Sequence, residues 1–133
     1  MSELLSVKKT IRGSVPRIPF EAIAREILGA HYELSLVICG DTLAQRMNAE
    51  YRKKTYRPNV LSFPIDTKEG EIFLNVPCAH REAKKYGTTL EKRLALLFVH
   101  GCFHLKGLDH QNEKDTKKME AQEQKILTRF HFA

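Results

Sequence analysis

The spacing of apolar positions divides the chain into alternating strands and helices. Alternating or short continuous apolar runs predict strands, and apolar residues that recur every three or four positions predict helices. The predicted strands are Leu4–Ile11, Tyr32–Cys39, Val60–Ile65 and Glu71–Val76. The predicted helices are Pro19–Leu28, Asp41–Arg52 with Asp41 as N-cap, Cys78–Tyr86, Leu90 to about Gly107, and Asn112–Phe130. This order favours an α+β fold, with a small mixed β-sheet of about four strands flanked by helices.

The length and composition indicate a single folded unit. A chain of 133 residues with 42% apolar and 29% charged residues can bury a core and is unlike a disordered protein. No repeat, low-complexity tract or Gly/Ser linker divides it, so we expect one domain over residues 1–133.

The sequence also indicates where the protein works. No apolar run reaches the length of about 20 residues that spans a membrane, and the first residues are too short and charged for a signal peptide. Cys39, Cys78 and Cys102 are scattered and odd in number, which favours reduced thiols. We therefore expect a soluble, cytoplasmic protein that does not bind membranes.

A basic segment suggests a polyanionic partner. The net charge is +6, and the segment YRKKTYR (residues 51–57) contains Arg52, Lys54 and Arg57 between two tyrosines. Arginine and lysine bind phosphates, and tyrosine can stack on an unpaired base. The alternative is an ordinary solvated basic loop, which is the common origin of a charge run taken alone.

Three of the six histidines fall in the window HGCFHLKGLDH, residues 100–110. Residues four apart lie on one face of a helix, so His100 and His104 can converge on one ion. Gly107 lets the chain leave the helix and brings His110 into reach as a third ligand. We predict a metal site at His100, His104 and His110.

This ligand set is typical of a catalytic ion. Three protein ligands leave a tetrahedral zinc ion one open position, whereas structural zinc sites normally fill all four. We expect one zinc ion per chain, although imidazole also suits nickel, copper and iron. Gly101 stands where proteases with the HExxH motif have their glutamate, which disfavours peptide hydrolysis by that machinery.

The histidine motif and the segment NVLSFP (residues 59–64) together resemble the YbeY family of bacterial metal-dependent endoribonucleases. The signature of that family is HGxLHLxGYDH, with a YRxKxxxTNVLSFP-like stretch and a Gly-Asp-Ile strand before it. The similarity spans about residues 34 to 127, with Gly70-Glu71-Ile72 in the place of Gly-Asp-Ile. Residues 55–58 depart from the pattern, because their proline is displaced by one position.

The resemblance implies a function and roles for particular residues. It implies an enzyme that matures the 3′ end of 16S rRNA and takes part in ribosome quality control, with rRNA and the small ribosomal subunit as partners and no DNA. His100, His104 and His110 match the zinc ligands, on a zincin-like helix. Arg52 matches the arginine beside the metal, where it would stabilise a phosphodiester transition state.

Other residues have weaker assignments. Lys54 matches the lysine that follows the arginine, and with Arg52 and Arg57 it is expected to bind RNA. Glu71 and Asp109 are candidate proton carriers, with a structural role as the alternative for each. Asp109 is also a candidate for orienting a ligand ring.

Two competing functions stay open at this point. One is a zinc hydrolase that cleaves a peptide or an ester. The other is a ribosome assembly factor without catalytic activity, in which zinc is structural.

Overall fold

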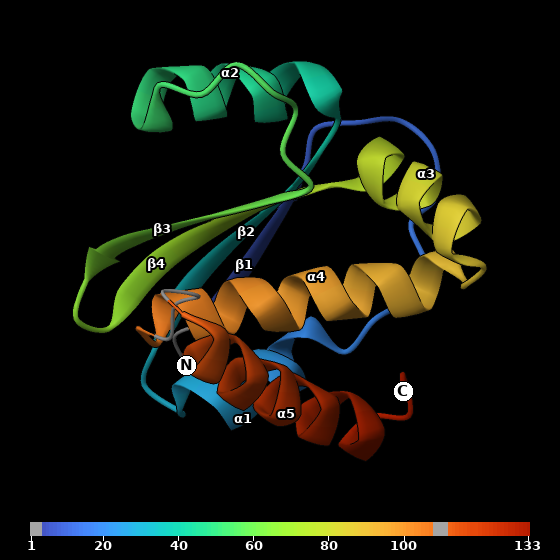
Figure 1. Ribbon diagram of the computed structural model, residues 1–133. Coiled ribbons are helices and arrows are strands. Elements are labelled where there is room, and N and C mark those ends of the chain that lie inside the picture. The colour runs from blue at the N-terminus through green and yellow to red at the C-terminus, as the bar shows by residue number, and fades with distance from the viewer. Residues whose placement is uncertain (1–3, 108–111) are drawn as a thin grey trace.

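The computed structural model describes residues 4–107 and 112–133, and within them four strands form one sheet in the order β1-β2-β4-β3 (Figure 1). The strands are β1 (Leu5–Lys9), β2 (Glu33–Cys39), β3 (Val60–Asp66) and β4 (Glu69–Asn75). β2 pairs in parallel with β1 and with β4, whereas β3 and β4 form an antiparallel hairpin. The mixed sheet confirms the predicted fold class.

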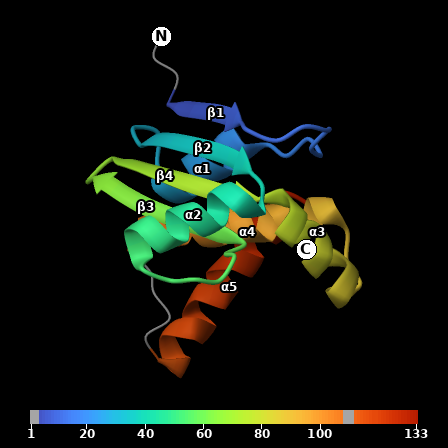
Figure 2. The same ribbon diagram turned by 90° about the horizontal axis from the view of Figure 1, so that it is seen from above.

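The helices cover both faces of this sheet. They are α1 (Phe20–Leu28), α2 (Asp41–Arg52), α3 (Val76–Tyr86), α4 (Leu90–Leu105) and α5 (Glu113–Arg129). α2 lies on one face, over the β3–β4 side of the sheet, and α1, α4 and α5 lie on the other (Figures 1 and 2). α4 is central, because it packs against β3, β4 and the helices α1, α3 and α5.

Alternation along the strands builds a core on each face of the sheet. In β2, Leu36 and Ile38 face the larger core under α1 and α4, and Val37 and Cys39 face a smaller core under α2. Phe98 of α4 is completely buried in the larger core. The helix that carries the histidine motif is therefore anchored along its length.

Side-chain caps fix several helix starts. Asn75 accepts a hydrogen bond from the Cys78 amide, Thr89 caps α4 and Asn112 caps α5. Because Asn75 caps α3, that helix begins at Val76, two residues before the predicted start. The prediction that Asp41 caps α2 is wrong: Gly40 is the N-cap, and Asp41 is the first helical residue.

Two further expectations concern the whole chain. Cys39, Cys78 and Cys102 are free thiols, as predicted. Among the described residues, none of the helices has the length and apolar character needed to cross a membrane.

Candidate functional site

An open cleft of about 560 Å³ lies where the end of α4 meets β3 and the segment 53–59 that follows α2. Polar groups make up much of its wall. Its lining residues are Arg52, Tyr56, Pro58, Asn59, Val60, Ser62, His100, His104 and Gly107. The fold thus brings Arg52 of the basic segment together with two residues of the histidine motif.

His100 and His104 lie one turn apart in the last part of α4. Their Nε2 atoms are 3.0 Å apart, and their ring centroids are 4.5 Å apart. Two nitrogens bound to one tetrahedral zinc ion lie about 3.3 Å apart, given zinc–nitrogen distances of about 2.0–2.1 Å. The two rings are therefore arranged as two ligands of one ion would be.

Glu123 of α5 contacts the other nitrogen of the His100 ring. Its Oε2 lies 2.6 Å from His100 Nδ1, and the residue is only 5% exposed. A carboxylate accepts hydrogen bonds, so Nδ1 is the donor, and in the neutral ring Nε2 keeps its lone pair on the side of His104.

The sequence contains a signal for Glu123 that the motif-based predictions do not use. Met119, Glu123 and Leu127 recur at intervals of four, and all three are buried. A charged residue in the middle of such an apolar stripe needs a buried partner.

His110, the predicted third ligand, and Asp109 lie outside the described residues. Within residues 4–107 and 112–133, no three His, Cys, Asp or Glu side chains form a group that could hold a metal ion. Gly107 has a φ of 101°, which suits its predicted place at the exit of the helix. The His100–His104 pair fits a metal ion, and ligation by His110 stays a prediction.

Gly101 is a packing residue between the two histidines. A Cβ at this position would lie 3.0 Å from Ser62 Oγ, 3.2 Å from Ile72 Cδ1 and 3.3 Å from Val60 Cγ2. Ser62 Oγ also donates a hydrogen bond of 3.0 Å to the Gly101 carbonyl. The missing side chain lets α4 approach β3 closely, and this contact sets the histidines against the cleft wall.

Two buried asparagines hold the segment that forms another wall of the cleft. Asn48 Nδ2 donates to the Tyr56 carbonyl and Asn75 Nδ2 donates to the Pro58 carbonyl, both at 3.0 Å. Both asparagines are completely buried. These bonds fix residues 53–59 although the segment has no regular secondary structure.

Arg52 and Tyr56 present different chemistry to the cleft. Arg52 ends α2 and offers a guanidinium, which forms paired hydrogen bonds with phosphates. Tyr56 is 53% exposed, so much of its ring is open to a ligand.

Known proteins are similar to this chain over most of its length. The family model described as "Endoribonuclease YbeY" matches residues 4–131. The protein named Endoribonuclease YbeY of Polynucleobacter asymbioticus is 34% identical, over 98% of this chain and 89% of its own length. That of Bordetella petrii is 41% identical, over 78% of this chain and 70% of its own length. The chain belongs to the YbeY endoribonuclease family.

A solved structure supports the fold alone. The solution structure of TM1509 from Thermotoga maritima matches with a TM-score of 0.62 at 19% sequence identity. The match covers 96% of this chain and 91% of that one. The mixed sheet and its helices therefore have an experimental counterpart.

Lys54 and Arg57, which were predicted to bind RNA together with Arg52, lie elsewhere. Neither is among the residues that line the cleft. The Arg81 guanidinium, which is hydrogen-bonded to Asp41, lowers the pKa of Asp41 to about 2, and Arg57 adds a smaller effect through its charge. Arg57 thus lies close enough to Asp41 to interact with it.

Glu71, in the family's Gly-Asp-Ile position, faces away from the histidines. Its Oε2 accepts a hydrogen bond of 3.3 Å from Ser35 Oγ, and both residues line a groove beside α2. The next residue, Ile72, is completely buried and lies close to Gly101 of α4. Since neighbouring residues of a strand face opposite sides, Glu71 is outside the cleft, and its position gives no support to a role as proton carrier.

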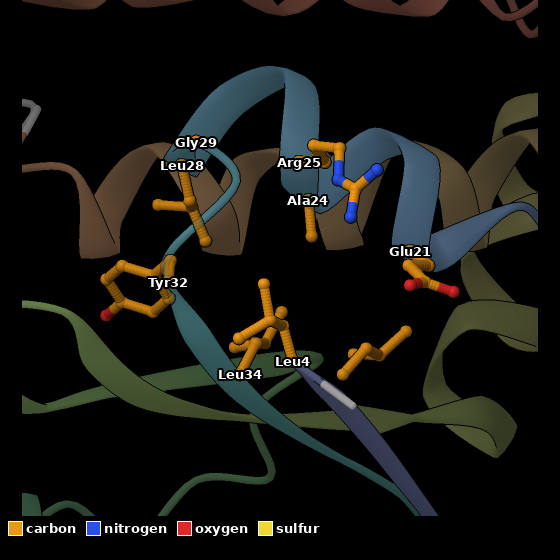
Figure 3. A pocket seen from close by; sticks show the side chains of 9 residues that line it. Leu4, Glu21, Ala24, Arg25, Leu28, Gly29, Tyr32 and Leu34 are labelled. Carbon is orange, nitrogen blue, oxygen red and sulfur yellow. The ribbon is translucent and has the colours of Figure 1, made fainter. Parts of the chain in front are cut away.

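A smaller hollow lies between α1 and the first two strands (Figure 3). Its volume of about 20 Å³ suits about one water molecule.

The Tyr32 hydroxyl is buried and has no hydrogen-bond partner among the described residues, and burial raises its pKa. Gly70 leaves the space that this hydroxyl and Leu105 occupy, because a Cβ there would lie too close to both.

Proposed function

We propose that this YbeY-family protein is a zinc-dependent endoribonuclease specific for single strands. It acts in the cytoplasm on the 3′ end of 16S rRNA during maturation and in ribosome quality control, with the small ribosomal subunit as partner. The observation that carries the proposal is the cleft that Arg52 shares with His100 and His104, in a chain of this family.

His100 and His104 would hold the zinc ion, with His110 as the third ligand. The support for this part is the 3.0 Å separation of the two Nε2 atoms and the contact of His100 Nδ1 with Glu123. A zinc ion supplies a Lewis acid at this point, able to polarise a phosphoryl oxygen or to acidify water.

Arg52 would bind the scissile phosphate. Its planar guanidinium can donate two parallel hydrogen bonds to the non-bridging oxygens. Negative charge increases on these oxygens in the transition state, so a donor already in place lowers the barrier.

Tyr56 would contribute the preference for single strands. Its half-exposed ring lies in the same cleft as Arg52 and can stack on a base that has left its partner. The bases of a duplex are already stacked and paired, so they are not available to this ring.

Cleavage of a defined RNA tests the proposal. The zinc-loaded protein should cut a single-stranded RNA containing the 3′ precursor end of 16S rRNA, and should leave the same RNA intact when it is annealed to its complement. His104→Ala should lower the rate at least about 100-fold through loss of metal. Arg52→Ala should lower it by about 10²–10³ at unchanged zinc content.

Matched variants separate this function from its competitors. His80→Ala and Arg46→Ala change exposed residues of α3 and α2 and should cleave like the wild type. Cleavage of casein or an ester in place of RNA would show another hydrolase. If the zinc-loaded wild type left the RNA as intact as His104→Ala does, while Arg52→Ala weakened RNA binding, the protein would be a non-catalytic assembly factor.

A further inference from the structure

Glu123 is a buried carboxylate on a helix that lies outside the wall of the cleft. This helix, α5, contributes no lining residue to the cleft within the described parts of the chain. The Oε2 atom of Glu123 nevertheless lies 2.6 Å from Nδ1 of His100, while the Nε2 of the same ring faces His104. One imidazole thus connects α5 to the candidate metal position.

We infer that Glu123 is a positioning residue of the metal site, an inference that rests on the proposed function. Its carboxylate accepts the Nδ1 proton of His100 in a hydrogen bond and thereby leaves Nε2 unprotonated and aimed at the ion. A neutral imidazole has one protonated nitrogen, and a metal binds only at the other. The contact therefore fixes both the tautomer and the direction of the ring.

Burial makes this contact more specific than an exposed ion pair. The side chain of Glu123 is 7% exposed and that of His100 is 29% exposed. A buried carboxylate costs free energy unless it is hydrogen-bonded. This cost favours the conformation in which Glu123 Oε2 stays hydrogen-bonded to His100 Nδ1. Exposed pairs of long side chains, such as Lys117 with Glu113 on the same helix, have no such constraint.

Packing alone does not account for a glutamate at this position. Met119 and Leu127, four residues before and after it, are 1% and 3% exposed and belong to the main core. A leucine at 123 would continue this apolar stripe, whereas a carboxylate there requires a polar partner. Glu123 meets that requirement with a predicted metal ligand.

Zinc affinity and the tautomer of His100 test the inference in two independent ways. The variants are Glu123→Gln, which keeps the shape and loses the charge, and Glu123→Leu, which loses the hydrogen bond. Competition with a chromophoric chelator should show zinc binding weakened about 10-fold in Glu123→Gln and up to about 100-fold in Glu123→Leu. In the zinc-free wild type, ¹⁵N NMR should show the His100 proton on Nδ1, and in Glu123→Leu it should move largely to Nε2.

Glu120→Gln is the matched control, because it removes the same charge from an exposed position one turn earlier on α5. It should bind zinc like the wild type. Circular dichroism identifies variants that fail to fold, and Glu123→Gln is the variant least affected by that risk. The inference is overturned if folded Glu123→Leu binds zinc within twofold of the wild type, or if wild-type His100 has its proton on Nε2. A wild type that binds zinc but leaves RNA uncut would refute the proposed function and leave the inference standing. A wild type that binds no zinc would overturn both.

Discussion

Asp41 joins the start of α2 to α3 and to the end of β4. The Arg81 guanidinium donates two hydrogen bonds to its carboxylate, at 2.7 and 3.0 Å, and Asn75 Nδ2 donates a third at 3.0 Å. Asn75 also binds the Pro58 carbonyl, so this small network reaches the wall of the cleft. The hydrogen bond from Arg81 is the main reason that the pKa of Asp41 falls to about 2.

The low pKa of Asp41 predicts a particular dependence of stability on pH. Because its pKa in the folded protein is below the ordinary value of 3.8, Asp41 stabilises the fold above about pH 4 and loses this effect as the pH falls towards 2. The Arg81 side chain is 54% exposed, so solvent screening limits the effect to about 1 kcal/mol or less.

Urea unfolding of the wild type and of Asp41→Asn at about pH 7 and about pH 2.5 checks this expectation. At about pH 7 the wild type should be more stable than Asp41→Asn. At about pH 2.5 this difference in the free energy of unfolding should be smaller. Asp66→Asn, at the exposed end of β3, should show no such change. An equal difference in stability between the two proteins at both pH values would contradict the lowered pKa of Asp41.

At the scale of single residues, the sequence could predict contacts only between residues that are close to each other along the chain. His100 and His104 are four positions apart on one helix, so their convergence follows from helix geometry. Glu123 is 23 positions from His100, and only the packing of α5 against α4 brings the two together. The prediction of Asp41 as a helix cap failed because Gly40 is the last extended residue and Asp41 already belongs to the helix.

Among the elements, the approach of α4 to β3 has the greatest consequence for the site. Gly101 permits this approach, with Ser62 of β3 as the closest side chain. Alanine is the better helix former by about 1 kcal/mol, but its methyl group would crowd three neighbours at 3.0–3.3 Å. Overpacking of this kind typically costs about 1–3 kcal/mol.

We therefore expect Gly101→Ala to lower the free energy of unfolding by about 1–2 kcal/mol. Thermal denaturation measures the effect. Ser62→Ala removes the nearest contact, so the double variant Gly101→Ala/Ser62→Ala should recover part of the loss. A single variant as stable as the wild type would show that α4 and β3 can separate without cost.

The elements were predicted better than their arrangement. Apolar periodicity is a local signal, and it located every strand and helix of the described chain within a few residues. The order β1-β2-β4-β3 is not local, because β4 enters the sheet between β2 and the strand that precedes it in sequence. That insertion places β4, with Ile72, in the middle of the sheet, where α4 packs against it.

For the molecule as a whole, a net charge of +6 favours RNA, but only Arg52 of the three predicted RNA-binding cations lines the cleft. The slope of log affinity against log salt is proportional to the number of phosphates that the protein contacts. With three contacts, affinity for a single-stranded RNA should fall about 20-fold between about 50 and 200 mM salt.

Binding isotherms of charge variants test which cations take part. Arg52→Gln should reduce the slope of log affinity against log salt by about 0.7. Lys54→Gln and Arg57→Gln should do the same only if these residues contact RNA outside the cleft, and Arg46→Gln should change little. Affinity that is independent of salt would argue against the basic segment as an RNA contact.

Family membership rests on signals that are spread over the whole chain, which is why the sequence could indicate it. The histidine motif, the NVLSFP segment and the Gly-Glu-Ile strand are separate in sequence and meet around α4 and the two strands of the hairpin. The last helix has no such motif, and its contribution to the site becomes visible only in the folded chain.

α5 follows all three predicted ligands along the chain, and this order has a genetic consequence. A premature stop codon between positions 112 and 122 would leave the histidine motif and every lining residue of the cleft in the translated product. The product would lack the carboxylate that contacts His100. A gene survey that scores homologues by the histidine motif would count such a truncated copy as intact, although the ring of its first histidine could turn.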